Sequence, residues 1–135
     1  VLGEALVAEL DARLGALADA GSRRRAAVLL AGGWTAGSGT MADALLGAIS
    51  LANVAAEAGL RGHGALRLEA LVAADPDLLV VEDAGDPGAS LSAELLRHPV
   101  LARGRARVVR MPARLWACPD AALADAAALL AGAAR

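Results

Sequence analysis

The chain is 135 residues long, and 57% of its residues are hydrophobic while 21% are charged. This composition is sufficient for the core of one domain and excludes a disordered chain. The net charge of −2 and the absence of a long basic run argue against a nucleic-acid-binding protein, because neutralising phosphates requires clustered lysines and arginines. A single cysteine, Cys118, excludes an intramolecular disulfide and a zinc cluster.

A helix and a buried strand are predicted at the start of the chain. Residues 2–20 carry apolar residues at helical spacing, and Gly21 ends this helix. The apolar residues 26–31 lie between charged residues and two glycines, which indicates a buried strand. Because Val1 already lies in the predicted helix and no signal peptide precedes it, we expect the chain to be part of a longer protein.

Two short helices are predicted after the first strand. One covers residues 40–46 and begins at Ser38 or Thr40, either of which could cap it through its hydroxyl. The other covers residues 51–57 and ends before Gly59. Both fit a composition in which alanine and leucine dominate, since these residues favour helix.

The middle of the chain runs from a helix through a proline into an apolar strand. Apolar residues at i, i+3 and i+4 make one helical stripe that starts at Leu68, while Glu69 lies on the opposite, solvated side. Pro76 ends the helix, because proline lacks an N–H donor and disfavours helix at the residue before it. Residues 78–81 are all apolar, which predicts a strand covered on both faces, as in a parallel sheet between helices.

The last third of the chain continues the same alternation. We predict a short helix over residues 91–96, a strand over residues 107–111 and a closing helix over residues 121–133. Strands that alternate with helices imply an α/β fold, a three-layer sandwich in which a small parallel sheet is flanked by helices. Residues 1–135 are therefore predicted to form a single Rossmann-like domain.

The candidate site lies where the predicted strands end, because ligands of such sheets bind at the carboxyl ends of the strands. The loops concerned begin at Gly32, Asp83 and Pro112. The first is rich in glycine, yet Gly39 stands where a P-loop needs lysine, and the third glycine of a dinucleotide fingerprint is missing. The glycines either contact a ligand or only permit a tight turn. A small nucleotide-binding domain of an enzyme is the alternative function.

The chain has two tryptophans and no phenylalanine or tyrosine, and both tryptophans fall in these loops. An indole there either contacts a flat apolar ligand or faces a partner protein, and the second indole could instead cap the apolar edge of the domain. If both indoles are buried, an interaction module without a small ligand is favoured. We predict ligand-binding residues in all three loops, namely Trp34, Thr35, Ser38, Glu82, Asp83, Pro112 and Trp116.

No residue pattern in the sequence is typical of catalysis. His63 and His98 are far apart and neither has a serine or cysteine partner nearby in sequence. Adjacent carboxylates such as Glu82 and Asp83 point to opposite faces of a strand, which suits solvation or a contact at a rim better than acid–base chemistry. We therefore predict no catalytic residues, no resident metal and no cofactor.

Several ordered segments make the chain similar to the carboxyl-terminal lobe of solute-binding proteins of ABC importers, of the class that carries cobalamin, haem and iron-siderophores. One segment departs from the pattern, because the family often has Ala-Gly-Gly before the asparagine where this chain has residues 49–52. The matching segments are residues 26–30, 37–40 with 44–46, 52–55, 68–71, 76–77, 98–99 and the strand that ends at Met111 and Pro112.

The resemblance implies a non-catalytic binding protein with two lobes, joined by a long helix and holding the ligand in the cleft between them. Residues 2–20 are then either a remnant of this connector, within residues 1–20, or the first helix of the lobe. In the family a surface glutamate on each lobe docks onto arginines of the permease, and Glu69 stands at the matching position. The resemblance thus places Glu69 on the permease side, whereas Glu82 and Asp83 lie at the cleft rim.

The resemblance also implies the ligand class, the partners and the location. The ligand would be an iron chelate, haem or a corrinoid, and haem is the less favoured because the chain has no tyrosine to bind iron. The partners would be the permease subunits and an amino-terminal lobe, and the full-length protein would be periplasmic or anchored outside the cytoplasm. An isolated lobe would bind ligand weakly or not at all and would tend to form homodimers.

Overall fold

A parallel four-stranded sheet forms the centre of the molecule. The computed structural model describes residues 2–83, 99, 104, 106–117 and 122–134. The sheet has the order β3-β1-β5-β6, and the strands are β1 (Arg25–Leu29), β3 (Ala52–Asn53), β5 (Leu78–Asp83) and β6 (Arg107–Pro112). The apolar residues of β1 and β5 are buried on both faces, which explains their unbroken apolar sequence.

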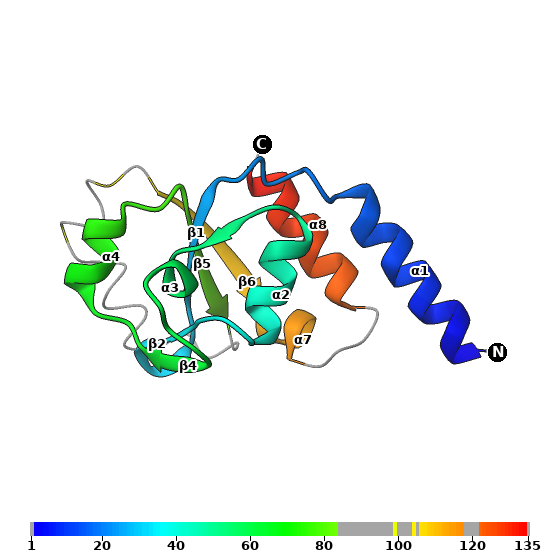
Figure 1. The fold of residues 1–135 in the computed structure, drawn as a ribbon, viewed down its shortest axis with the longest axis horizontal. Helices are drawn as coiled ribbons and strands as arrows, with labels where there is room; N and C mark the ends of the chain where they lie inside the picture. The colour runs from blue at the N-terminus through cyan, green and yellow to red at the C-terminus, as the bar shows by residue number, and fades with distance from the viewer. Residues whose placement is uncertain (1, 84–98, 100–103, 105, 118–121, 135) are drawn as a thin grey trace.

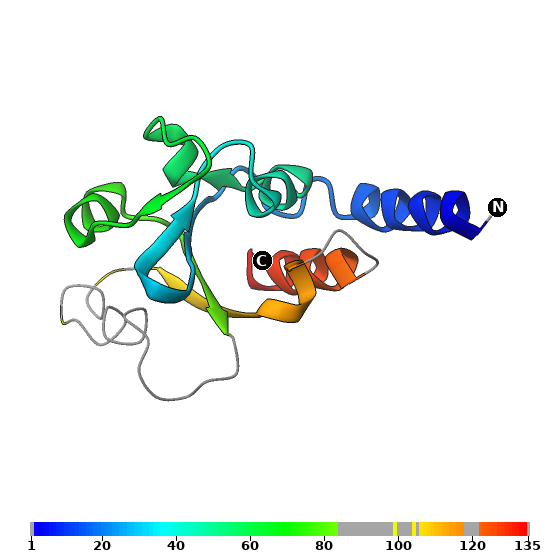
Figure 2. The ribbon, with the colours of Figure 1, turned by 90° about the horizontal axis from the view of Figure 1, so that it is seen from below.

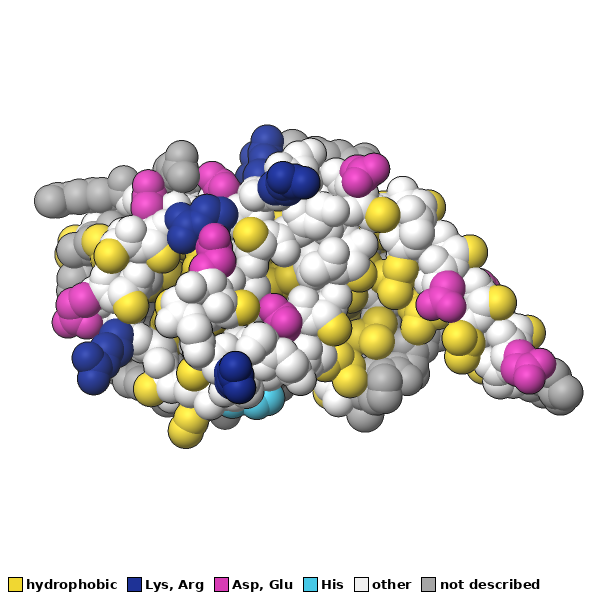
Figure 3. Space-filling view, viewed as in Figure 1, with side chains coloured by type: hydrophobic (Ala, Val, Ile, Leu, Met, Phe, Trp, Pro, Cys, Tyr) yellow, Lys and Arg dark blue, Asp and Glu magenta, His cyan; other side chains and the backbone are white. Residues whose placement is uncertain are grey.

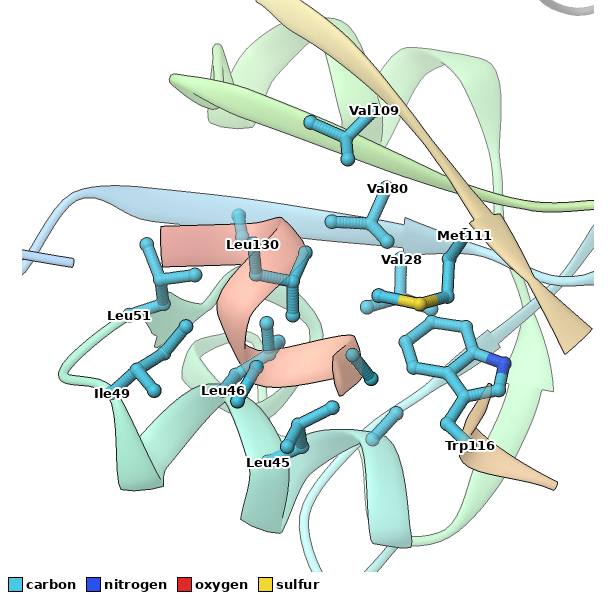
Figure 4. Close-up of a cluster of buried hydrophobic side chains, with 14 of the residues drawn as sticks. Val28, Leu45, Leu46, Ile49, Leu51, Val80, Val109, Met111, Trp116 and Leu130 are labelled. Atoms are coloured by element: carbon cyan, nitrogen blue, oxygen red, sulfur yellow. The ribbon is translucent and has the colours of Figure 1, made fainter. Parts of the chain in front are cut away.

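Helices cover both faces of this sheet, as the edge-on view in Figure 2 shows. On one face lie α2 (Met41–Ala48) and α8 (Ala122–Ala134), with the short α7 (Ala113–Trp116) beside them. On the other face lie α3 (Val54–Glu57) and α4 (Leu68–Ala74). The side chains between the sheet and helices α2 and α8 form the larger core. Figure 4 shows part of it, with Val28, Leu45, Leu46, Ile49, Leu51, Val80, Val109, Met111, Trp116 and Leu130.

The first helix, α1 (Leu2–Ala16), extends away from the body of the molecule toward the amino terminus (Figure 1). Its second half is attached, because Arg13 pairs with Asp125 of α8 at 2.9 Å and Leu14 packs against the larger core. Its first half is not covered: Leu6 is 53% exposed and Val7 59% exposed. Apolar side chains are visible along this helix in Figure 3. None of the helices in the described ranges combines the length and apolarity that a membrane span requires.

A small antiparallel hairpin, which the sequence did not predict, lies next to the main sheet. A 3₁₀ turn, η1 (Ala31–Gly33), leads into β2 (Trp34–Ala36), and β2 pairs with β4 (His63–Ala65). The turn that follows β2 is close-packed: a Cβ on Gly37 would lie 2.2 Å from the carbonyl oxygen of Leu60, so this position accepts only glycine.

The passage from α4 to β5 explains how the predicted proline segment works. Asp75 ends the helix in a left-handed conformation, with φ of 43°, and Pro76 is buried. Asp77 then pairs with Arg25 in two ways, because its N–H donates to the Arg25 carbonyl at 2.8 Å and its carboxylate accepts from the Arg25 N–H at 2.9 Å. These bonds start β5 in register with β1, where Leu78 lies opposite Ala26.

The predicted fold class and the three predicted strands are confirmed, and two helical predictions need correction. Residues 17–20 are a turn rather than the end of the first helix, since the Leu17 N–H bonds only three residues back to Leu14. The predicted helix 51–57 contains a strand, because the Ala52 N–H donates to Arg24 beside β1 at 2.8 Å and only Val54–Glu57 is helical. The predicted helix 91–96 lies outside the described residues.

Candidate ligand-binding edge of the sheet

The parallel register brings three chain segments together at one edge of the sheet. Leu29 at the end of β1 lies opposite Val81 of β5, and Asp83 at the end of β5 lies opposite Pro112 of β6. The η1 turn follows β1 and α7 follows β6. The segments in which ligand-binding residues were predicted therefore lie at the edge where the strands end, called the carboxyl edge here. In Figure 1 this edge is at the bottom, where β2, β4 and α7 gather.

Trp34 is held at this edge with its indole exposed. Gly32 and Gly33 both have positive φ angles, of 77° and 81°, and turn the chain so that the Leu30 N–H donates to the Trp34 carbonyl at 2.7 Å. A Cβ on Gly32 would lie 3.3 Å from Cδ1 of the indole, so the ring folds back over the turn. Trp34 is nevertheless 51% exposed, which is unusual for a tryptophan and suits a contact with a ligand or partner.

The polar residues that follow Trp34 are less accessible than their predicted role suggests. Thr35 is 3% exposed, and its hydroxyl has no hydrogen-bond partner among the described residues. Ser38 is half-buried and its hydroxyl donates to the Leu60 carbonyl at 3.3 Å. The cap of α2 is Thr40, whose hydroxyl accepts from the Asp43 N–H at 3.2 Å, so the choice between Ser38 and Thr40 is settled in favour of Thr40.

The glycine-rich turn does not offer a free anion cradle. The Gly37 N–H donates to the Gly62 carbonyl at 2.8 Å, and the Ser38 N–H donates to the Leu60 carbonyl at 2.9 Å. Phosphate loops need such N–H groups to point at the ligand, and here both are used within the protein. The glycines therefore serve the turn, and the nucleotide alternative loses its main support.

Asn53 connects this turn to the main sheet, a role that the sequence did not reveal. Its amide nitrogen donates to the Ala36 carbonyl at 2.8 Å and to the Asp43 carboxylate at 3.0 Å, while its amide oxygen accepts from the Ala55 N–H at 3.1 Å. One buried side chain thus fixes β2, the first turn of α2 and the start of α3 together. Such satisfied buried networks favour a single arrangement of the backbone.

Trp116 differs from Trp34 because it lies below the surface. It is 6% exposed and belongs to the larger core beside Met111 (Figure 4). Its indole N–H donates to the Glu82 carboxylate at 2.8 Å. Glu82 is half-buried and Asp83 is exposed at the end of β5, with half-buried Pro112 opposite Asp83. The edge therefore contains one exposed and one buried tryptophan, and the reading of Trp116 as a cap of the apolar edge fits its burial.

Glu69 lies at the same end of the molecule as Trp34. The Leu66 N–H donates to the Gly33 carbonyl at 3.0 Å, and Glu69 follows three residues later, exposed in the first turn of α4. The helix then runs to the opposite edge, where Ala74 accepts a hydrogen bond from Arg25. The expected docking glutamate therefore follows closely on the segment that bonds to the turn before Trp34.

His63 is exposed in β4, whereas His98 and Cys118 fall outside the described residues. In the part of the chain that the structure describes, no three His, Cys, Asp or Glu side chains gather closely enough to hold a bare metal ion.

Solved structures of transport proteins share this fold. The chain matches a periplasmic haem-binding protein from Pseudomonas aeruginosa at 28% identity and a TM-score of 0.77, covering 96% of this chain and 52% of that protein. It matches a periplasmic haem-binding protein from Roseiflexus at 27% identity and a TM-score of 0.74, covering 98% of this chain and 57% of that protein. An ABC-type Fe³⁺-hydroxamate transport protein from Saccharomonospora viridis matches at 26% identity and a TM-score of 0.71. The match covers 96% of this chain and 48% of that protein.

The predicted resemblance to ABC-transporter binding proteins is confirmed. The chain spans about half the length of these solved proteins, as a single lobe of such a protein would. The neighbours are transport proteins rather than enzymes. No protein-family model and no curated protein sequence matches the chain.

The bond between Trp116 and Glu82 can be tested by mutation. Trp116→Phe removes the indole N–H, and Glu82→Ala removes its acceptor. In a double-mutant cycle we expect a coupling energy of about 1 kcal/mol, because a hydrogen bond to a half-buried carboxylate contributes roughly that much. Chemical denaturation of the four variants measures it. Additive effects within about 0.3 kcal/mol would show that the pair does not stabilise α7.

Proposed function

We propose that the chain is one lobe of an extracytoplasmic binding protein that holds a metal chelate and delivers it to an ABC permease. The observation that carries the proposal is the similarity to three transport proteins whose names specify haem or Fe³⁺-hydroxamate. The exposed indole of Trp34 supports it, since a bulky chelate presents a large apolar surface that an aromatic ring can cover.

The helix α1 supports a second lobe. Leu6 and Val7 expose apolar side chains on the half of α1 that extends from the body, and the matched proteins contain nearly as much chain again. We propose that α1 belongs to the connector and that this lobe is the carboxyl-terminal one, with the ligand held between Trp34 and the other lobe. In the absence of that lobe, the apolar surface of α1 would drive self-association of the chain.

A panel of ligands tests the proposed function. The full-length protein that contains this chain is titrated with ferric haem, a ferric hydroxamate, cobalamin and, as contrast, ATP and NAD. We expect micromolar or tighter binding of one metal-containing ligand, weakened about tenfold by Trp34→Ala, because an aromatic contact contributes about 1.5 kcal/mol. Arg24→Ala, at the opposite edge, is the control. Binding of a nucleotide without any metal-containing ligand would contradict the proposal.

Glu69 is proposed to dock on the permease. An exposed carboxylate at the ligand end of the lobe can pair with a permease arginine, and such pairs orient partners and speed association. Glu69→Lys should therefore weaken binding of the full-length protein to its permease in proteoliposomes while ligand affinity stays unchanged. Glu9→Lys, which changes an exposed carboxylate on α1, is the matched control. Equal loss of permease and ligand binding would rule out the docking role.

A further inference from the structure

Glu82 is held in one orientation at the carboxyl edge of the sheet. Its Oε2 accepts a hydrogen bond of 2.8 Å from the indole N–H of Trp116, a residue that is only 6% exposed. The indole packs in the larger core beside Met111 (Figure 4), so its neighbours keep the ring in place. A fixed, buried donor therefore orients the half-buried carboxylate of Glu82.

The second carboxylate oxygen of Glu82 is available to a ligand. Within the described ranges of the chain, Oε2 is bonded to Trp116 and Oε1 has neither a hydrogen bond nor an ion pair. Oε1 is not enclosed either, since the only described side-chain oxygen or nitrogen that is both buried and unpartnered belongs to Thr35. Glu82 thus presents one oriented acceptor to the outside of the lobe.

Glu82 lies beside the turn that carries Trp34. In the register of β1 and β5, Leu29 lies opposite Val81. One residue further along each strand brings Leu30 level with Glu82, at the spacing of neighbouring strands, which is about 4.8 Å. The Leu30 N–H donates to the Trp34 carbonyl at 2.7 Å. The oriented carboxylate and the exposed indole therefore come from adjacent segments of the edge at which the ligand is proposed to bind.

A carboxylate oxygen accepts hydrogen bonds and donates none, so it favours N–H, O–H and ammonium groups and repels another carboxylate. Building on the proposed function, we infer that Glu82 is a specificity-determining residue that reads the rim of the bound chelate, and that Trp116 is the positioning residue that aims it. A donor or a positive charge on the ligand is favoured at this point, and a ligand carboxylate is disfavoured. Trp116 then acts through Glu82 and not through the ligand contact predicted from its place in the sequence.

Matched ligands that differ only in peripheral charge test the inference. The full-length protein is titrated with three pairs: ferric haem and its diamide, a ferric trihydroxamate with a terminal amine and its N-succinyl derivative, and cobalamin and its monocarboxylic acid. In each pair that binds, the member without a carboxylate should bind about tenfold more tightly, because a hydrogen bond to a charged group contributes about that factor.

Glu82→Gln should reverse this preference. The glutamine oxygen accepts the bond from the Trp116 N–H, which leaves its NH₂ group, a donor, at the free position. Trp116→Phe removes the orienting N–H and should bring the two affinities closer without reversing their order, a change of selectivity that a purely structural role would not produce. Glu57→Gln, which removes a carboxylate beside Arg25 at the opposite edge, should leave the preference unchanged. Far-ultraviolet circular dichroism checks that each variant folds.

The possible results separate the inference from the function on which it rests. Equal affinity within every pair that binds, a wild-type preference for the carboxylate-bearing member, or the same preference in wild type and Glu82→Gln would overturn the role of Glu82 and leave the proposed function intact. A preference that Trp116→Phe does not alter would overturn the positioning role of Trp116. Failure of all six ligands to bind would overturn both the inference and the proposed function.

Discussion

The parallel pairing of β5 with β1 on one side and β6 on the other is the constraint on which the rest of the structure depends. Asp77 sets its start through two hydrogen bonds to the Arg25 backbone. From there the register runs without a bulge to Asp83, opposite Pro112. Because a parallel sheet collects all its carboxyl ends on one side, the η1 turn and α7 lie along the same edge although they are distant in sequence.

The two tryptophans at this edge have different environments and therefore different tasks. Trp116 fills the core below the edge, and its one polar atom is satisfied by Glu82. Trp34 instead covers Gly32 and leaves about half of its surface open. Trp116 therefore stabilises the edge from within, whereas Trp34 is available for contact with a ligand or partner. The mostly aliphatic core concentrates the aromatic surface of the chain at this one edge.

The sequence predicted those features that depend on local patterns. The apolar runs of β1 and β5 were recognisable because both faces are buried, and Pro76 marked the boundary between helix and strand. The missed strands are short and depend on distant partners: β3 has two residues, too few for a pattern, and β2 joins β4 through backbone bonds. The sequence left open whether Trp116 caps the apolar edge or contacts a ligand, because its partner Glu82 lies 34 residues away. Burial of a single side chain depends on such tertiary contacts rather than on its neighbours in sequence.

The central claim is that the carboxyl edge of this sheet faces the ligand and a second lobe. The most direct measurement is a crystal structure of the full-length protein with its bound metal chelate. The claim predicts that the chelate lies between two lobes in contact with Trp34, and that the second lobe covers Leu6 and Val7 of α1. A chelate bound elsewhere, with Trp34 still facing solvent, would contradict it.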